Sequence, residues 1–154
     1  NGLLLIRPNS TEFHDHFTAL RNDLLQTGLI RDVAESGNTI TRGGRTEGGF
    51  NWKGKNPSLR DEFASFAVTY DYGKVIGWQI SAGRDFSPSF STDASGLILN
   101  EAAVAYMGLK NPVGETVTRG EKKYTVIGVS RNMIINSPYE NGSQRTGREF
   151  SARN

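Results

Sequence analysis

The stretch from residue 83 to residue 130 constrains the fold more than any other part of the sequence, because it is rich in residues that begin, end or turn secondary structure. The apolar run 97–99 predicts a short buried strand. Asn100 follows it with a side-chain acceptor suited to the first free N–H groups of a helix. Gly108 can adopt the left-handed conformation that ends such a helix. A strand followed at once by a short helix is therefore predicted.

A β-hairpin is predicted directly after this helix. Turn residues at 110–114 lead into two runs, 116–119 and 122–129, whose patterns are typical of strands. Gly120 lies between them, and a glycine at the first position of a two-residue loop suits a tight hairpin turn. The whole region thus indicates a mixed α and β architecture.

The first 40 residues predict a strand, a helix and a second strand. Leu3 to Arg7 is a short apolar run, as expected for a buried strand. A helix is expected to begin after Ser10 or Thr11 and to end at Gly28, because apolar residues recur at spacings of three and four. These residues are Phe13, Phe17, Leu20 and Leu24. A weaker strand within 29–40 would complete a β-α-β unit.

The middle of the chain changes from a polar loop to alternating strands. Residues 41–60 are rich in Gly, Arg, Asn and Lys, which indicates an exposed hairpin or a mobile loop. Alternation over 62–70 predicts a strand with one more apolar face. Asp71 can then cap one or two helical turns that end at Gly77, and 78–82 alternates into another strand.

These elements predict an α+β protein with a mixed sheet, a β-α-β unit and a second, smaller β-rich lobe that carries one short helix. One domain is expected over 1–140, with two lobes at roughly 1–40 and 60–140 joined by the loop 41–60. The tail 141–154 has almost nothing to bury and is expected to be poorly ordered. A chain of 154 residues is long enough for one domain with a core of its own.

Composition excludes several classes of protein. The 18 basic and 16 acidic residues give a net charge of +2, which is too balanced for a nucleic-acid surface. No cysteine is present, so disulfides, thiolate metal sites and cysteine nucleophiles are excluded. No apolar run approaches the roughly 20 residues that a transmembrane helix needs.

Three motifs suggest chemistry but are better explained as structure. Residues 49–56 resemble a phosphate-binding loop, but they lack the preceding apolar strand, the following helix and the final hydroxyl. His14 and His16 point about 200° apart on a helix and cannot hold one ion; Glu12 and His16, one turn apart, could, but a solvated helix face explains them better. Ser130 lacks the second glycine of a nucleophile elbow. We therefore expect no enzyme activity, no catalytic residue, no cofactor and no metal.

Three residues remain as candidate contacts with a partner. Phe50 and Trp52 are aromatic residues in a polar loop, where they either anchor a partner or fold back over the sheet. Arg84 either contacts a partner or covers apolar surface beside Asp85, which is expected to accept backbone hydrogen bonds in a turn. If Phe50 and Trp52 are contact residues, both must be exposed in the isolated domain.

The order of motifs resembles the extracytoplasmic domain of MacB-like ABC transporter permeases, whose transmembrane part is called FtsX-like. The resemblance covers about 68–140. It rests on Asn100-Glu101-Ala102-Ala103 after a strand, on Asn111-Pro112-Val113-Gly114, on Tyr124 to Val129, and on Ser137-Pro138-Tyr139-Glu140. Gly83-Arg84-Asp85-Phe86 also fits, whereas Gly73 stands where an aromatic residue is usual.

This resemblance implies a domain outside the bacterial inner membrane, in the periplasm, between the first and second transmembrane helices of a permease subunit. Such a domain would relay ATP-driven motion of the helices to a substrate or partner, for export, extrusion or signalling. The implied partners are a second permease subunit, identical or different, a separate cytoplasmic ATPase, and a peptide, lipoprotein or small molecule. The absent initiator Met and the immediate apolar run suggest a piece of a longer, membrane-anchored chain.

Two alternatives come from other classes of protein. The first is a free-standing periplasmic or secreted ligand-binding module that shares the fold without a transporter. The second is an enzyme, which would require titratable side chains gathered in one pocket.

Overall fold

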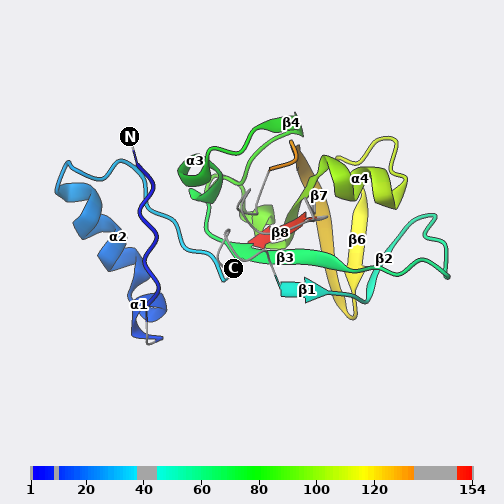
Figure 1. Cartoon of the computed structure of the whole chain (residues 1–154), viewed down its shortest axis with the longest axis horizontal. Coiled ribbons are helices and arrows are strands. Elements are labelled where there is room, and N and C mark those ends of the chain that lie inside the picture. Colours follow the sequence, from blue (N-terminus) through cyan, green and yellow to red (C-terminus); the bar gives the residue numbers. More distant parts are fainter. Residues whose placement is uncertain (1, 9–10, 38–44, 134–148, 154) are drawn as a thin grey trace, which may run out of the picture.

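The computed structural model describes residues 2–8, 11–37, 45–133 and 149–153. In chain order the elements are α1 (Glu12–Asp15), α2 (Phe17–Gln26), β1 (Arg45–Glu47), β2 (Phe50–Trp52), β3 (Phe63–Val68), α3 (Tyr72–Ile76), β4 (Ile80–Gly83), the 3₁₀ helix η2 (Ser91–Ser95), β5 (Gly96–Asn100), α4 (Glu101–Met107), β6 (Thr116–Arg119), β7 (Lys122–Ser130) and β8 (Glu149–Arg153). Figure 1 shows α1 and α2 standing beside a body built around one sheet. The predicted α+β class with a mixed sheet is confirmed.

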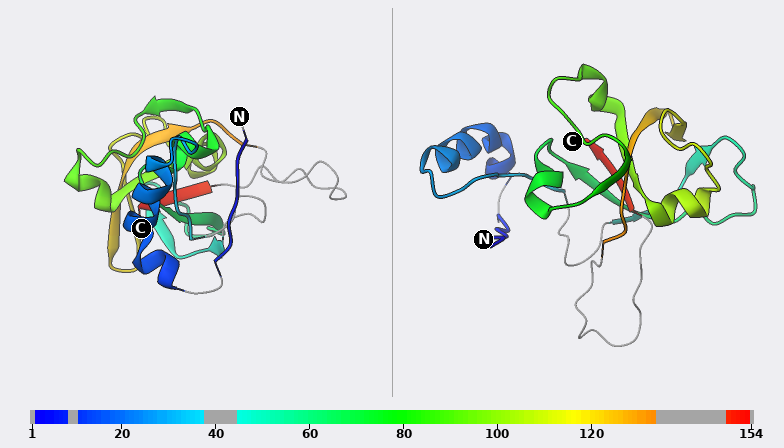
Figure 2. Two further views of the ribbon diagram at one scale, coloured as in Figure 1. Left: turned by 90° about the vertical axis from the view of Figure 1, so that its left-hand side faces the viewer. Right: turned by 90° about the horizontal axis from the view of Figure 1, so that it is seen from above.

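One curved sheet of eight strands organises the body (Figure 2). The strand order is β1-β3-β8-β5-β7-β6-β2, and β4 pairs with β7 beside this path. The two ends of this order, β1 and β2, are neighbours in the chain, separated by Gly48 and Gly49. Arg119 of β6 joins the two edges, because its Nη1 lies 2.7 Å from Oε2 of Glu47 on β1. The sheet therefore curls far enough for its edges to meet.

The core has two hydrophobic clusters, and alternate residues of β5 separate them. Leu97 and Leu99 belong to the first cluster and Ile98 to the second. Since successive side chains of a strand point to opposite faces, β5 is covered on both sides and all five of its residues are buried. The first cluster also contains Phe50, Trp52, Phe63, Ala103, Met107, Val117 and Val126. The second also contains Phe66, Val68, Tyr72 and Phe86.

The local signals of the central region are confirmed. The Oδ1 atom of Asn100 accepts a hydrogen bond from the backbone N–H of Ala103 at 2.8 Å, as expected for an N-cap. Gly108, with φ of 68°, ends α4, and Gly77, with φ of 71°, ends α3. The predicted hairpin forms between β6 and β7 around Gly120.

The β-α-β unit lies elsewhere than predicted. β5 and β7 are parallel neighbours with α4 between them in the chain. By contrast, Leu3 to Arg7 is not a strand, because no strand of the sheet pairs with it. Residues 29–37 form only an isolated bridge between Ser36 and Val68, and 38–40 lie outside the described residues. The predicted long helix is two helices, α1 and α2, which meet at His16.

The end of the chain contributes a central strand. β8 runs parallel to β3 on one side and antiparallel to β5 on the other. The prediction of a poorly ordered tail is therefore wrong for 149–153, while 141–148 lies outside the described residues. The physical reason is that a strand bonded on both edges is held by its backbone, so a polar sequence can occupy it.

The predicted linker between two lobes is part of the sheet. β1 and β2 lie within 41–60, where β1 pairs with β3 and β2 with β6. Residues 45–47 and 50–52 are thus strands and not a mobile loop, whereas 41–44 lie outside the described residues. The division into lobes at roughly 1–40 and 60–140 stays a prediction.

Candidate interaction site

Phe50 and Trp52 are core residues, not surface contacts. Phe50 is 1% exposed and Trp52 5%, and both point into the first cluster, while Asn51 between them points outward. The ring of Phe50 meets that of Phe63 edge to face at 5.4 Å, and the indole N–H of Trp52 donates to the backbone oxygen of Met107 at 3.0 Å. Of the two alternatives, burial rules out contact with a partner and leaves the one in which both side chains fold over the sheet, because β2 pairs with β6 and turns alternate residues inward.

Lys55 closes the turn after β2 instead of holding a phosphate. Its Nζ atom lies 2.6 Å from the backbone oxygen of Phe50 and 3.0 Å from Oδ1 of Asp61, and it stands over the ring of Trp52. Partial burial raises the pKa of Asp61, but hydrogen bonds from Lys55 and the N–H of Phe50 outweigh it, so the pKa is lowered. No helix follows the turn. The resemblance of 49–56 to a phosphate-binding loop is therefore a coincidence of sequence.

Arg84 pairs with a buried carboxylate. Its two terminal nitrogens donate to the two oxygens of Asp93 at 2.8 and 2.6 Å, and its guanidinium lies 3.9 Å from the ring centroid of Phe90. Asp93 has 0% exposure and also accepts from the backbone N–H of Ser87. The hydrogen bonds between Arg84 and Asp93 raise the pKa of Arg84. Sequence reasoning missed Asp93, since a single acid in a polar loop gives no sign of burial.

Asp85, a second acid of this turn, is only partly buried. It accepts from the indole N–H of Trp78 at 2.8 Å and from the backbone N–H of Phe86 at 2.7 Å. The latter bond was expected from the turn. Burial raises the pKa of Asp85 although these hydrogen bonds oppose the shift. Gly73 leaves room for the pair, because a Cβ there would lie 1.8 Å from Nε1 of Trp78.

Apolar side chains are exposed on the N-terminal segment and the two helices. Leu3, Leu4, Leu5 and Ile6 are between 52% and 74% exposed. Phe13, at 46%, lines a shallow hollow with Glu12, His16 and Leu20. Exposed apolar side chains gathered on one part of a molecule are typical of interaction surfaces. Sequence reasoning assigned the same residues to a strand and to the buried face of a helix.

Two acids of the body meet basic side chains of α1 and α2. Nη2 of Arg21 lies 2.5 Å from Oδ2 of Asp71, and Nδ1 of His14 lies 2.8 Å from Oε1 of Glu35. His14 is thus engaged with a carboxylate and does not share a cluster with His16. In the described part of the chain, no three His, Asp or Glu side chains form a group able to hold a metal ion.

None of the helices within the described residues combines the length and the apolar character required to span a bilayer.

Comparison with known structures identifies the fold. The periplasmic region of MacB from Actinobacillus actinomycetemcomitans superimposes with a TM-score of 0.58 at 17% identity, over 88% of this chain and 54% of that one. A domain of a putative permease protein from Porphyromonas gingivalis gives a TM-score of 0.55 at 13% identity, over 84% of this chain and 54% of that one. The chain thus spans about half the length of either structure.

The family comparison covers nearly the whole sequence. No curated protein matches the chain. A family model, that of the MacB-like periplasmic core domain, matches residues 2–150 and confirms the resemblance seen in the sequence. The chain therefore belongs to the family of MacB-like periplasmic core domains, which are periplasmic domains of ABC transporter permeases.

Proposed function

We propose that this domain relays ATP-driven motion of transmembrane helices to a substrate or partner in the periplasm. The observation that carries the proposal is the family match over residues 2–150, since an ABC transporter permease couples ATP hydrolysis on one side of the membrane to movement of its helices. The domain would be tied to the inner membrane through the rest of the permease. A second permease subunit and a separate cytoplasmic ATPase are the partners that this role requires.

The fold supports a mechanical role. The eight-stranded sheet curls until its two edge strands meet, and a hydrophobic cluster covers each face of its central strand β5. Such a sheet suits a body that moves as a unit. Arg84 and Asp93 form an ion pair with two hydrogen bonds whose carboxylate is fully buried, and this pair closes a turn. Most of the exposed large apolar side chains lie outside this body, at Leu3 to Ile6, Phe13 and Leu29, whereas Phe90 and Val113 are exposed on it. A rigid body with a separate apolar surface is suited to passing on a displacement.

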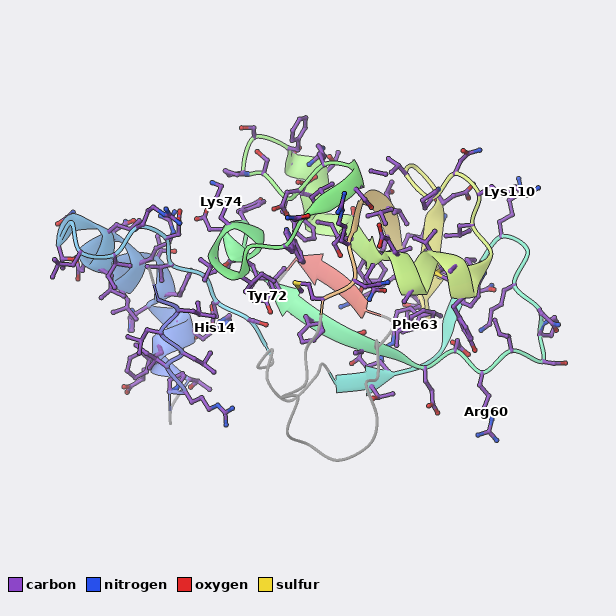
Figure 3. All side chains as sticks on the ribbon, turned by 45° about the horizontal axis from the view of Figure 1, so that its top comes forward. His14, Arg60, Phe63, Tyr72, Lys74 and Lys110 are labelled. Carbon is purple, nitrogen blue, oxygen red and sulfur yellow. The ribbon has the colours of Figure 1, made fainter. Side chains whose placement is uncertain are left out.

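A distance measurement in the intact transporter tests the relay. One spin label is placed at Lys110, which is exposed and lies at the end of the body far from α1 and α2 (Figure 3). In the permease pair with its ATPase, reconstituted in lipid nanodiscs, we expect the distance between the two labelled domains to change when ATP binds. A nucleotide that the ATPase does not bind serves as the control and leaves the distance unchanged.

The result that contradicts the relay is equally direct. If the distance between the two domains is the same without nucleotide, with ATP and after trapping with vanadate, the domain does not follow the helices. The assay needs no knowledge of the substrate, which the sequence and the fold leave open among peptides, lipoproteins and small molecules.

A further inference from the structure

The N-terminal part of the chain is held to the body without contributing to its core. We call residues 2–8 and 11–30 the arm, and residues 33–37, 45–133 and 149–153 the body. Neither α1 nor α2 has a buried residue, and no described residue of the arm belongs to either hydrophobic cluster. Figures 1 and 2 show both helices beside the sheet and not on one of its faces. The position of the arm must therefore depend on contacts other than core packing.

A partly buried ion pair joins the middle of the arm to the body. Arg21 of α2 donates to Asp71, which precedes α3, and the two side chains are only 33% and 19% exposed. Asp71 also pairs with Lys74 of α3 at 3.2 Å, but Lys74 is 67% exposed, so this pair adds little to holding the carboxylate in place. Figure 3 shows Lys74 at the end of the body nearest the arm. Arg21 thus reaches a carboxylate on the side of the body that faces the arm.

A second contact, a hydrogen bond that becomes an ion pair when His14 is protonated, joins α1 to the body. His14 of α1 meets Glu35, whose backbone exchanges hydrogen bonds with Thr69 at the end of β3. The N–H of Gly37 donates to the oxygen of Ala67 on β3. Ala34 packs against the second cluster. Glu35 therefore has a fixed position in the body. The first of the two helices, α1, contacts it through His14.

The connection between arm and body has the features of a hinge. Gly28 has φ of 69°, in the left-handed region that other residues avoid, and ends the turn after α2. Leu29 next to it is 91% exposed. Arg31 pairs only locally, with Asp32, among the contacts found for it. Residues 28–32 consequently connect the arm to the fixed segment at 34–37 with little packing of their own.

We propose that the arm is a hinged element, latched against the body by Arg21 with Asp71 and by His14 with Glu35, which swings about residues 28–32 when the latch opens. Its role as the part that receives the displacement of the transmembrane helices rests on the proposed function. The latch itself does not. Ion pairs of this exposure have small free energies, so the latched state is favoured by a modest factor and a moderate force opens it.

Spin-label distances in the 154-residue chain test the latch. The chain has no cysteine, so Asp23→Cys on α2 and Lys110→Cys on the body give one labelled pair at exposed positions. We expect a distance distribution dominated by one narrow population for the otherwise unchanged chain. Arg21→Gln should raise the share of a second, broader population about twofold to fivefold, the effect of losing one partly exposed ion pair.

The matched control changes the same carboxylate's other partner. Lys74→Gln removes a charge that also pairs with Asp71 but lies on the body, so the arm should keep its narrow distribution. Glu35→Gln should broaden the distribution as Arg21→Gln does, and the two changes together should broaden it further. About 1 M salt, which shortens the screening length to about 3 Å, should move the unchanged chain in the same direction.

Two results would overturn the latch. One is an unchanged distribution in Arg21→Gln together with Glu35→Gln, which would mean that other contacts hold the arm. The other is an equal broadening in Lys74→Gln, which would mean that Asp71 acts through α3. Unfolding curves of each variant establish that the body remains folded. A latch that behaves as expected, in a transporter whose domains do not move with ATP, would leave the latch intact and reject the relay.

Discussion

At the scale of single residues, replacement of Asp93 should lower the stability of the body more than replacement of any other side chain. Its carboxylate is fully buried, holds both terminal nitrogens of Arg84 and accepts the N–H of Ser87. Asp93→Ala removes all of these bonds and leaves the Arg84 charge without its partner. We expect the free energy of unfolding, measured by urea denaturation, to fall by about 2–4 kcal/mol.

A matched variant separates charge from shape at this site. Asp93→Asn keeps the size of the side chain and one acceptor, so its free energy of unfolding should fall about half as far as that of Asp93→Ala. A loss below about 0.5 kcal/mol for Asp93→Ala would show that water replaces the carboxylate without cost, since Arg84 is 35% exposed.

Asp71 should make stability depend on pH in the acid range. Partial burial raises its pKa, but hydrogen bonds from Arg21 and Lys74 outweigh burial, so the pKa in the folded state is lowered. A lowered carboxyl pKa gives stability that is present above the unfolded pKa of about 3.9 and is lost as pH falls through the folded pKa. The difference in unfolding free energy between the unchanged chain and Asp71→Asn should thus be constant near pH 6 and shrink below about pH 4.

The Arg21→Gln background supplies the control for this titration. Without the Arg21 hydrogen bond, the pKa of Asp71 is lowered less, so the pH-dependent part of the difference should become smaller. Asp85 lies close enough for its charge to interact with those of Asp71 and Lys74, and its own pKa is raised, mainly by burial. The contribution of Asp85 to the pH dependence of stability therefore has the opposite sign, and it is present both with and without the Arg21→Gln change. A difference that stays constant down to pH 3 would contradict the assignment to Asp71.

At the scale of elements, the sequence predicted those that are specified by their own residues. A cap at Asn100, left-handed glycines at Gly77 and Gly108, and the turn at Gly120 act over a few residues, so their effect can be read locally. The same region carried the family resemblance, which the family comparison confirms. Local chemistry thus sufficed for α4, for the hairpin of β6 and β7, and for the end of α3 at Gly77. The predicted side-chain cap at Asp71 is wrong, because its carboxylate makes no cap hydrogen bond to α3 and accepts from Arg21 and Lys74 instead.

Elements that depend on distant partners could not be predicted. The apolar run Leu3 to Arg7 has the composition of a strand but no strand beside it, and its side chains are exposed. Phe50 and Trp52 stand in a polar sequence, yet pairing with β6 buries them. β8 has no apolar pattern and is formed by partners on both sides. In each case the deciding contact lies far away in the chain.

Removing β8 should abolish cooperative folding of the body. A chain that ends at residue 148 leaves facing edges of β3 and β5 without partners at the centre of the sheet. Each buried N–H or C=O group left unpaired costs about 1–3 kcal/mol, and several are affected at once. Thermal unfolding followed by circular dichroism should show no sharp transition. A cooperative transition near that of the full chain would mean that the sheet closes without β8.

At the scale of the whole molecule, the arm and the body should be separable. A chain that begins at residue 31 loses the arm and its two ion pairs but no described residue of either cluster. We expect a cooperative transition and a free energy of unfolding lower by at most about 2 kcal/mol. Loss of cooperativity, or a loss as large as that from removing β8, would show that the arm belongs to the folding unit.

The position of β8 also sets the order in which the molecule can be assembled. A chain exported from its N-terminus presents β3 and β5 long before 149–153, and until then both strands carry open hydrogen-bonding edges. Nascent protein in this state is prone to pair with other extended polypeptides, and periplasmic chaperones that shield such edges would have to act during this interval. Completion of the sheet consequently waits until residues 149–153 have left the export channel.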